Sequence, residues 1–428
     1  MEPPVTSRNA VAAAPDPAIF ERARRLFLQG LEALESGRPA HAEECFLSSL
    51  ALLPRRSSTL VNLAAARLDL GRPADALATV EEVIAMEPDN LDAWFHRGTA
   101  CGLLDRNADA LESFERLLAI DDGIAEPWLR RGQVLQSLKR PREALASYDR
   151  ALAIDPALAS AWTNRGGILQ EMRRLDEAAE AFRQALAQGG DPDLNRYYLA
   201  SVGGAGAPPG APASYVRSLF DDYADEFDEH LVKVLGYRAH TALAARLASH
   251  AARRFRSAID LGCGTGLCAP HLAPIADRLT GVDLSRQMLE RAAARGLYRQ
   301  LIEADIARHL EETSATHDLV VAADVFIYIG DLAPIFSAVR RVLEPGGVFC
   351  FSVEVAASGC SSYELQPSLR YAHAESYIRR LAADEGFDVD GLYREPLRQD
   401  QRETVDGLFV YLTGGPSAPK KACTSLTQ

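Results

Sequence analysis

A short motif recurs at a fixed interval in the first half of the chain. WFHRG (94–98), WLRRG (128–132) and WTNRG (162–166) follow one another every 34 residues, and LFLQG (26–30) and LVNLA (60–64) hold the two earlier positions of the same period. Small residues recur later in each unit, at Ala42, Ala76, Ala110, Ala144 and Ala178. Large residues follow them at Phe46, Val80, Phe114, Tyr148 and Phe182. Such a period predicts stacked repeats that bury one another's apolar faces.

This pattern resembles the tetratricopeptide repeat over roughly residues 23–190, which would make five units. The small residues would let two helices approach closely, and the large residue would fill the space between units. Residues 193–201 are expected to form a capping helix, so the repeat domain would span residues 23–201. The resemblance implies a groove that binds an unknown protein or peptide, although the Lys and Asn set that clamps a C-terminal carboxylate is missing.

Three arginines recur beside the glycines of the motif, at Arg97, Arg131 and Arg165. They could form a ladder that binds anions. The favoured interpretation is that they are solvated or paired residues at a permissive repeat position, because exposed charges are usually of that kind.

The overall charge limits the classes of partner. The net charge is −13, so a general binder of DNA or of a membrane surface is not expected, because both partners are polyanionic. The seven cysteines form no CxxC pair, so neither a disulfide framework nor a metal site is predicted, and a cytoplasmic location fits best. Residues 1–22 show no signal peptide and are expected to be disordered.

The second half has a different organisation. Residues 202–213, VGGAGAPPGAPA, are predicted to be a linker that gives the two halves some freedom. From residue 214 to 413, strand-like and helix-like segments alternate, which predicts a doubly wound α/β domain before a disordered tail at 414–428. Seven strands are expected near 256–261, 278–283, 299–303, 318–323, 347–353, 386–392 and 406–413. Helices are expected near 266–277, 285–296, 332–343 and 373–384.

A glycine-rich turn follows the first of these strands, in AIDLGCGTGL (258–267). Glycines there let the backbone adopt positive φ and approach a ligand. A dinucleotide site would have the spacing GxGxxG, and a phosphate loop would have GK followed by Ser or Thr. The chain has neither, and Asp260 would repel a pyrophosphate but would suit an amino group or a cationic centre.

Further carboxylates follow the next strands. Asp283 ends the second strand, where it can accept hydrogen bonds from ribose hydroxyls, and Asp305 ends the third, where it could face an adenine amino group. Asp324 and Tyr328 follow the fourth strand. The carboxyl ends of parallel strands share one edge of a sheet, so these side chains are expected to meet.

Together with LEPGGVFCFSVE (343–354), these residues resemble the class I S-adenosylmethionine-dependent methyltransferases over about 215–413. The combination with repeats and with YVRSLFDDYADEFDEHL (215–231) is similar to a bacterial group of tetratricopeptide-containing methyltransferases with no settled substrate. The resemblance implies a repeat α-solenoid followed by a Rossmann-like seven-stranded domain, with S-adenosyl-L-methionine as cofactor.

The family's roles can be carried over to matching positions. Gly262 and Gly264 would approach the methionine part of the cofactor, with Asp260 near its amino end through backbone or water. Asp283 would bind the ribose. The adenine would lie between Asp305 and Ile306, and Asp324 would line the floor below the sulfonium. Asp260 could also simply stabilise the turn.

The methyl acceptor is less well indicated. Transfer of an activated methyl mainly requires a held and aligned nucleophile, so no catalytic triad is needed and none is found. Tyr328 and His373 are the candidate catalytic residues. Arg370 with His373 could bind a carboxylate or activate a hydroxyl, or both could cap a helix that begins near residue 370.

Aromatic residues at helical spacing offer a candidate lid. Tyr223 is the favoured lid residue, whereas Phe220 and Phe227 are expected to pack in the helix core. The acceptor could be a small molecule or a protein side chain. The alternative function is a repeat scaffold with a non-catalytic methyltransferase-like domain.

Overall fold

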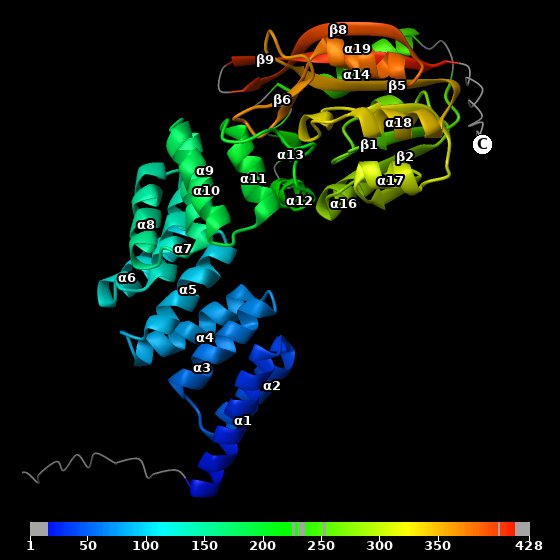
Figure 1. Cartoon of the computed structure of the whole chain (residues 1–428). Helices are drawn as coiled ribbons and strands as arrows, with labels where there is room; N and C mark the ends of the chain where they lie inside the picture. Colours follow the sequence, from blue (N-terminus) through cyan, green and yellow to red (C-terminus); the bar gives the residue numbers. More distant parts are fainter. Residues whose placement is uncertain are drawn as a thin grey trace, which may run out of the picture. The chain divides into compact units, whose positions relative to one another are not determined.

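The computed structural model describes residues 16–224, 227–229, 231, 236–250, 254–400 and 403–415. The chain divides into two compact units between Gly190 and Asp191 (Figure 1). The predicted disorder at 1–15 and at 416–428 lies outside the described residues. Residues 17–22 differ from the prediction, because α1 begins at Pro17, where the Asp16 side chain accepts a hydrogen bond from the Ala18 amide.

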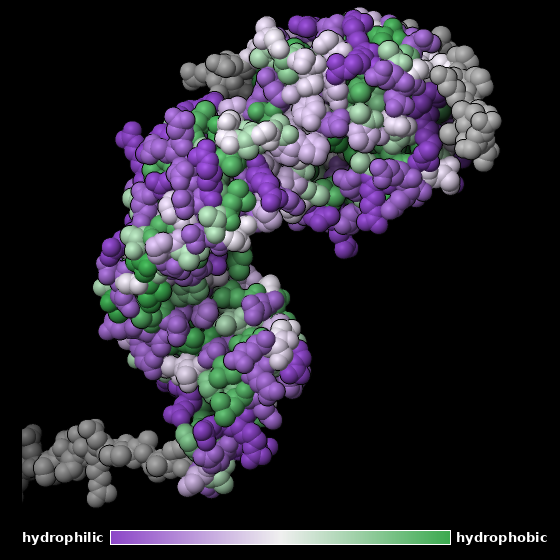
Figure 2. Space-filling model, in the orientation of Figure 1, coloured by the Kyte–Doolittle hydropathy of each residue, from purple (hydrophilic) through white to green (hydrophobic). Residues whose placement is uncertain are grey.

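The described part of the first unit forms ten helices, which pair into the five predicted repeats (Figure 1). Their bounds are α1 Pro17–Glu35, α2 Pro39–Leu52, α3 Ser57–Asp69, α4 Pro73–Met86, α5 Leu91–Leu103, α6 Asn107–Ile120, α7 Ala125–Ser137, α8 Pro141–Ile154, α9 Ala159–Glu171 and α10 Leu175–Ala187. Hydrophobic residues show among hydrophilic ones on the visible face of this unit (Figure 2).

The glycine of each motif packs on the large residue of the same helix pair. A Cβ on Gly132 would lie 2.4 Å from Cε1 of Tyr148, and the glycines of three other repeats are crowded by their own aromatic residues in the same way. The second repeat has Ala64 in place of glycine and Val80 in place of the aromatic residue, so a smaller partner leaves room for the methyl group. The large residue therefore packs inside its own helix pair, and Phe46 also shares a core cluster with Leu63 and Ala66 of the next repeat, as predicted for a residue between units.

The recurring arginines are paired. Arg97 donates to Ser113 Oγ at 2.6 Å, Arg131 donates to Ser147 Oγ at 2.8 Å, and Arg165 donates to Asp149 at 2.7 Å. Each guanidinium also lies 5.4–5.8 Å from the centroid of the tryptophan three residues before it. The structural interpretation of this ladder is confirmed.

The second unit holds a mixed sheet. Its strands are β1 Ala258–Leu261, β2 Leu279–Asp283, β3 Gln300–Glu303, β4 His317–Ala322, β5 Leu343–Val355, β6 Tyr363–Leu365, β7 Tyr371–His373, β8 Phe387–Asp400 and β9 Glu403–Gly414. The first five run parallel in the order β3-β2-β1-β4-β5, and β9 adds antiparallel to β5 and to β8. All seven predicted strands are present, and β6 and β7 form an additional hairpin at the end of β5.

Helices cover both faces of this sheet. Apolar residues of α17 (Ile306–Glu312), α18 (Ala333–Val342) and α19 (Glu375–Asp384) pack in one core cluster, and those of α14 (Ala239–His250) and α15 (Ala269–Leu272) pack in the other. The remaining helix of the strand–helix series is α16 (Arg286–Ala294), which contacts β2 and β3. Helix α19 begins at Glu375 rather than 373, because Tyr371–His373 pair with β5 and β6.

The start of the second unit differs from the predicted domain boundary. Helix α11 (Pro192–Ser201), expected to cap the repeats, groups with the sheet unit, and the Tyr197 hydroxyl donates to the Leu369 carbonyl at 2.5 Å. The predicted linker is also hydrogen-bonded within this unit, since Gly210 bridges Ile329. The segment from 208 to 211 is therefore not a free linker.

Candidate active site

A cavity of about 370 Å³ lies at the carboxyl ends of β1, β2 and β4. That volume is in the range of roughly 300–1,000 Å³ typical of ligand pockets. Seven of the nine predicted site residues line it, namely Gly262, Gly264, Asp283, Asp305, Ile306, Asp324 and Tyr328. Asp260 and His373 are not among the lining residues.

The glycine turn needs its glycines for two different reasons. Gly262 has φ of 64°, and a Cβ there would lie 1.7 Å from Cγ2 of Val325. Gly264 has φ of 53°, but the nearest atom to its Cβ position is 4.0 Å away, in Phe227. Gly262 is therefore required by the packing below the turn, and Gly264 leaves open space on the cavity side.

Asp283 is held at the end of β2 by the backbone. Its Oδ2 accepts the Gly264 amide at 2.8 Å and its Oδ1 accepts the Ser285 amide at 2.9 Å. Burial raises the pKa of this carboxyl, and the two amides oppose that shift. Each oxygen keeps a second lone pair, so the carboxylate can still accept hydrogen bonds from a diol.

Asp305 and Ile306 lie where β3 leads into α17. Asp305 Oδ1 caps the helix by accepting the Arg308 amide at 3.0 Å, while Ile306 is buried. The cap orients Asp305 at the cavity rim. Ile306 supplies an apolar surface beside it, which suits a flat ring.

Asp260 is buried in β1 and is not among the residues that line the cavity. It is 1% exposed, and its Oδ2 accepts the Tyr298 hydroxyl at 2.6 Å. Oδ1 has no hydrogen-bond partner among the described residues, and burial raises the pKa of this carboxyl to about 7. Asp260 is therefore bonded to Tyr298, whose ring lies against Gly266 of the turn, and its role in the site stays a prediction.

The far end of the cavity is built around Tyr328. Arg370 donates a hydrogen bond to its phenol oxygen, and burial raises the pKa of the phenol. Phe220 packs edge-on against the Tyr328 ring at 5.5 Å. Neutral tyrosine and a guanidinium thus stand side by side near Ile327 and Ile329, and the charged Asp324 and Arg398 also line the cavity and act on the pKa of the phenol.

A buried ionic group connects this end with the cavity floor. Arg398 contacts both carboxylate oxygens of Asp324 at 3.3 Å and also pairs with Glu354. Asp324 has φ of 58°, and its amide donates to Ser352 Oγ at 2.9 Å. These contacts hold Asp324 in a backbone conformation that is costly for a residue other than glycine.

His373 is not a catalytic residue in this geometry. It is fully buried in β7, and its Nε2 lies 2.9 Å from the Ile329 carbonyl and 3.1 Å from the Gly330 carbonyl. Burial lowers the pKa of the imidazole to about 4, so it is neutral and donates from Nε2. The side chain fixes the loop that carries Tyr328 and does not reach the cavity.

Two short helices cover the cavity, α12 (Ala213–Tyr223) and α13 (Phe227–Glu229). Phe220 and Phe227 line it and also pack on each other with their ring centroids 5.9 Å apart, so the predicted packing is present together with a place in the cavity wall. The Tyr223 side chain lies outside the described residues. Asp228 of α13 pairs with Thr265 of the glycine turn and with Arg295, which attaches the cover to the turn.

Sequence reasoning missed several lining residues. Arg398 comes from β8, and His240 from α14, where its ring stacks on Tyr237 at 5.3 Å. Burial lowers the pKa of His240 to about 4. Neither residue lies in a motif, and only the long-range fold brings them to the cavity.

Comparisons with known proteins agree with this architecture. Residues 259–351 match the methyltransferase domain family, and residues 61–123, 125–158 and 159–187 match tetratricopeptide repeat families. A malonyl-[acyl-carrier protein] O-methyltransferase of Enterobacter lignolyticus is 31% identical over 177 residues, 40% of this chain and 65% of that protein. A ubiquinone biosynthesis O-methyltransferase of Methylococcus capsulatus is 29% identical over 175 residues, 36% of this chain and 68% of that protein.

The first of these relatives is thus matched over less than two thirds of its length. Among solved structures, the tetratricopeptide protein TTC0263 of Thermus thermophilus is 25% identical, covering 42% of this chain and 98% of that one with a TM-score of 0.37. The segment that matches the methyltransferase domain family includes the parallel strands β1 to β4 and most of β5. The chain thus joins a segment that matches the methyltransferase domain family to a preceding segment that matches tetratricopeptide repeat families.

Two features are absent from the residues that the structure describes. None of the helices there combines the length and apolarity needed to cross a membrane. No group of three or more His, Cys, Asp or Glu in those same ranges could hold a metal ion.

Proposed function

We propose that the chain transfers the methyl group of S-adenosylmethionine to an oxygen atom of a negatively charged acceptor. The observation that carries this proposal is that one cavity has both sets of residues in its lining. The lining extends from the Gly262–Gly264 turn and Asp283 to Tyr328 and Arg370. One end offers a carboxylate and open backbone to a cofactor. The other offers a cation to an acceptor.

The cofactor end suits each part of S-adenosylmethionine. Asp283 would accept the ribose hydroxyls, and Ile306 with Asp305 would flank the adenine. The space beside Gly264 would take the methionine part. Asp324, held by Arg398, would lie below the sulfonium, whose positive charge activates the methyl group.

The residues of the acceptor end would bind and align the nucleophile. Arg370 can hold an oxyanion while the nearby apolar side chains exclude water, which strengthens the charge interaction. An anionic oxygen has no proton to lose before it attacks, so a general base is not needed. A reaction without a general base agrees with the pKa shifts in the cavity. Burial raises the pKa of Tyr328, which keeps the phenol protonated, and lowers that of His240, which makes the imidazole a weaker base.

An oxygen acceptor also agrees with the names of similar proteins, which include malonyl-[acyl-carrier protein] and ubiquinone biosynthesis O-methyltransferases. The matched region leaves part of the malonyl-[acyl-carrier protein] enzymes uncovered, so their acceptors are not transferred to this chain. These two groups share methylation at oxygen, whereas a dimethylglycine N-methyltransferase is also among the similar proteins.

The repeats would supply protein recognition. Repeats of this family act in protein–protein interaction, and we propose that here they bind a protein that carries the acceptor or delivers it. Exposed apolar side chains on the described helices of this unit are available for such contacts, among them Leu28, Leu47, Leu103 and Ile120.

The test is transfer of labelled methyl from S-adenosylmethionine to a lysate, separated into protein and small-molecule fractions. The full chain should label one fraction, and mild alkali should release the label as methanol if the product is a methyl ester. Asp283→Asn should abolish labelling, because its amide would face a backbone N–H.

Asp318→Asn is the matched control. Asp318 also accepts one backbone amide on each oxygen, from Ser257 and Arg256 at 2.9 Å, but it lies at the opposite end of the sheet. It should keep labelling. If the wild-type chain binds S-adenosylmethionine but labels no fraction, the proposed activity is wrong.

A further inference from the structure

The segment between α11 and α12 is hydrogen-bonded to the loop that carries Tyr328. The Ala211 amide donates to the Tyr328 carbonyl at 2.9 Å. The Pro209 carbonyl accepts the amides of Gly330 and Asp331, both at 2.8 Å. The Pro208 carbonyl accepts the Tyr371 hydroxyl at 2.8 Å. We call residues 208–211 the strap.

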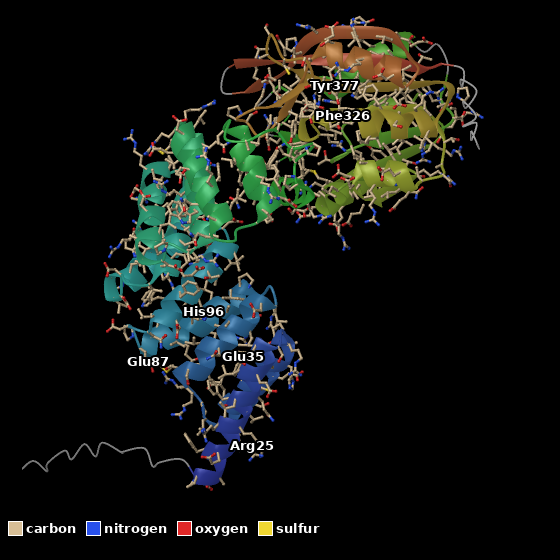
Figure 3. The ribbon with its side chains drawn as sticks, viewed as in Figure 1. Arg25, Glu35, Glu87, His96, Phe326 and Tyr377 are labelled. Carbon is tan, nitrogen blue, oxygen red and sulfur yellow. The ribbon has the colours of Figure 1, made fainter. Side chains whose placement is uncertain are left out.

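The opposite side of the same loop is also held. His373 bonds the carbonyls of Ile329 and Gly330. The Tyr377 hydroxyl, labelled in Figure 3, accepts the Leu332 amide at 3.0 Å and donates to Asp331 at 2.9 Å. The loop 328–331 therefore lies between the strap on one side and β7 with α19 on the other.

The composition of the strap makes it stiff. Proline restricts its own φ and keeps the preceding residue extended. Pro208, Pro209 and Pro212 thus favour an extended chain, and their carbonyls remain free to accept hydrogen bonds. This is the physical reason why VGGAGAPPGAPA does not form a free linker here, although Gly and Ala dominate its first half.

The strap also reaches the cavity. Ala211 of the strap lines it, as do Tyr328, Ile329 and Arg370, which belong to the segments that the strap contacts. Tyr371, whose hydroxyl bonds the strap, is the residue next to Arg370. Tyr328 and Arg370, the two polar residues of the proposed acceptor end, thus belong to segments that are hydrogen-bonded to the strap.

We propose that the strap is the acceptor-side wall of the active site, and that it positions Tyr328 and Arg370 and limits the size of the acceptor. The proposal rests on the proposed function for the identity of the acceptor end. The part of the chain that leads to the repeats would then also determine which acceptor fits.

The first test is hydrogen exchange of the full chain, resolved to single amides and without acceptor. In the wild type, the amides of Ala211, Gly330 and Asp331 should exchange at least about 100-fold slower than in an unstructured peptide. Tyr371→Phe should speed all three by about tenfold or more. Exchange of Ala211 at the unstructured rate in the wild type would overturn the strap.

Tyr411→Phe is the matched control, since the Tyr411 hydroxyl bonds the Leu243 carbonyl at 3.0 Å in the other core cluster. It removes the same type of buried bond and should lower the melting temperature similarly. The three strap amides should not change. Equal acceleration in both variants would mean general destabilisation and would contradict the proposal.

The second test separates the acceptor wall from the cofactor end. Ala211→Leu in the full chain should reduce methyl transfer at least tenfold, while the affinity for S-adenosylhomocysteine stays within twofold. Loss of S-adenosylhomocysteine binding would place residue 211 at the cofactor end and overturn the assignment. If the wild type transfers no methyl, the proposed function fails, and the exchange experiment still decides whether the strap is held.

Discussion

The two ends of the cavity are built in different ways. Most of the cofactor end comes from one run of chain, residues 262 to 306, in which three successive strands each end in a turn at the same edge of the sheet. The acceptor end combines the strap, the loop after β4, the turn before β7 and Arg398 of β8. The end of a cavity that is made by local strand–turn units therefore has a sequence motif. An end that is assembled from distant segments of the chain has none.

Gly262→Ala should cause the largest loss of ligand affinity at the cofactor end. The added methyl group would overlap Val325 and the residue would need a left-handed φ, which together cost about 3–4 kcal/mol. The affinity for S-adenosylhomocysteine in calorimetry should fall about 100-fold or more. Gly264→Ala is the control, because it incurs only the φ cost of about 1–2 kcal/mol. Equal losses in the two variants would contradict the packing argument.

The acceptor end should respond to Arg370→Met. Loss of a charged hydrogen bond to an anionic acceptor costs about 1.5–3 kcal/mol, so methyl transfer should fall about 10- to 100-fold. S-adenosylhomocysteine affinity should stay within twofold. Arg370→Lys should retain part of the rate, because it keeps the charge but loses the planar donor pair. A matching loss of cofactor affinity would show that the two ends are not separate.

Below the cofactor end, Asp260 should make stability depend on pH. The native carboxyl keeps its proton up to about pH 7, whereas the unfolded one loses it near pH 4. Its stabilising contribution is therefore present below about pH 4 and is lost as the pH rises towards 7. Between pH 5 and 8 the wild type should lose on the order of 2 kcal/mol more unfolding free energy than Asp260→Asn. Parallel denaturation profiles for the two proteins would be inconsistent with a buried protonated Asp260.

A substitution in the repeat unit should have the smallest effect on the active site. Gly132→Ala should cost about 1–3 kcal/mol, because its Cβ would overlap Tyr148. Adding Tyr148→Val should recover part of that loss, since Ala64 and Val80 already form this pair in the second repeat. Thermal unfolding measures both variants. Cofactor affinity should be unchanged, and a large change would link the repeats to the cofactor end.

Much of the fold could be predicted because it depends on local patterns. The 34-residue period gave five helix pairs, and alternating apolar segments placed seven strands close to their observed positions. The cofactor residues from Gly262 to Ile306 were found by their place after strands. Their roles stay predictions, but their meeting in one cavity is a structural fact.

The remainder depends on contacts that no local pattern contains. His373 was selected for its chemistry, but β7 buries it against carbonyls of the 328–331 loop. Arg398 reaches Asp324 from β8, far along the sequence. The Gly/Pro/Ala segment has the composition of a linker, and only its partners in the second unit make it a strap.

The most direct test is a calorimetric titration of S-adenosylhomocysteine into three proteins. They are the wild-type full chain, Asp283→Asn and Arg370→Met. The account predicts one saturable site in the wild type, at least about 30-fold weaker binding in Asp283→Asn, and an unchanged affinity in Arg370→Met. Absence of binding to the wild type, or equal affinity in wild type and Asp283→Asn, would contradict it.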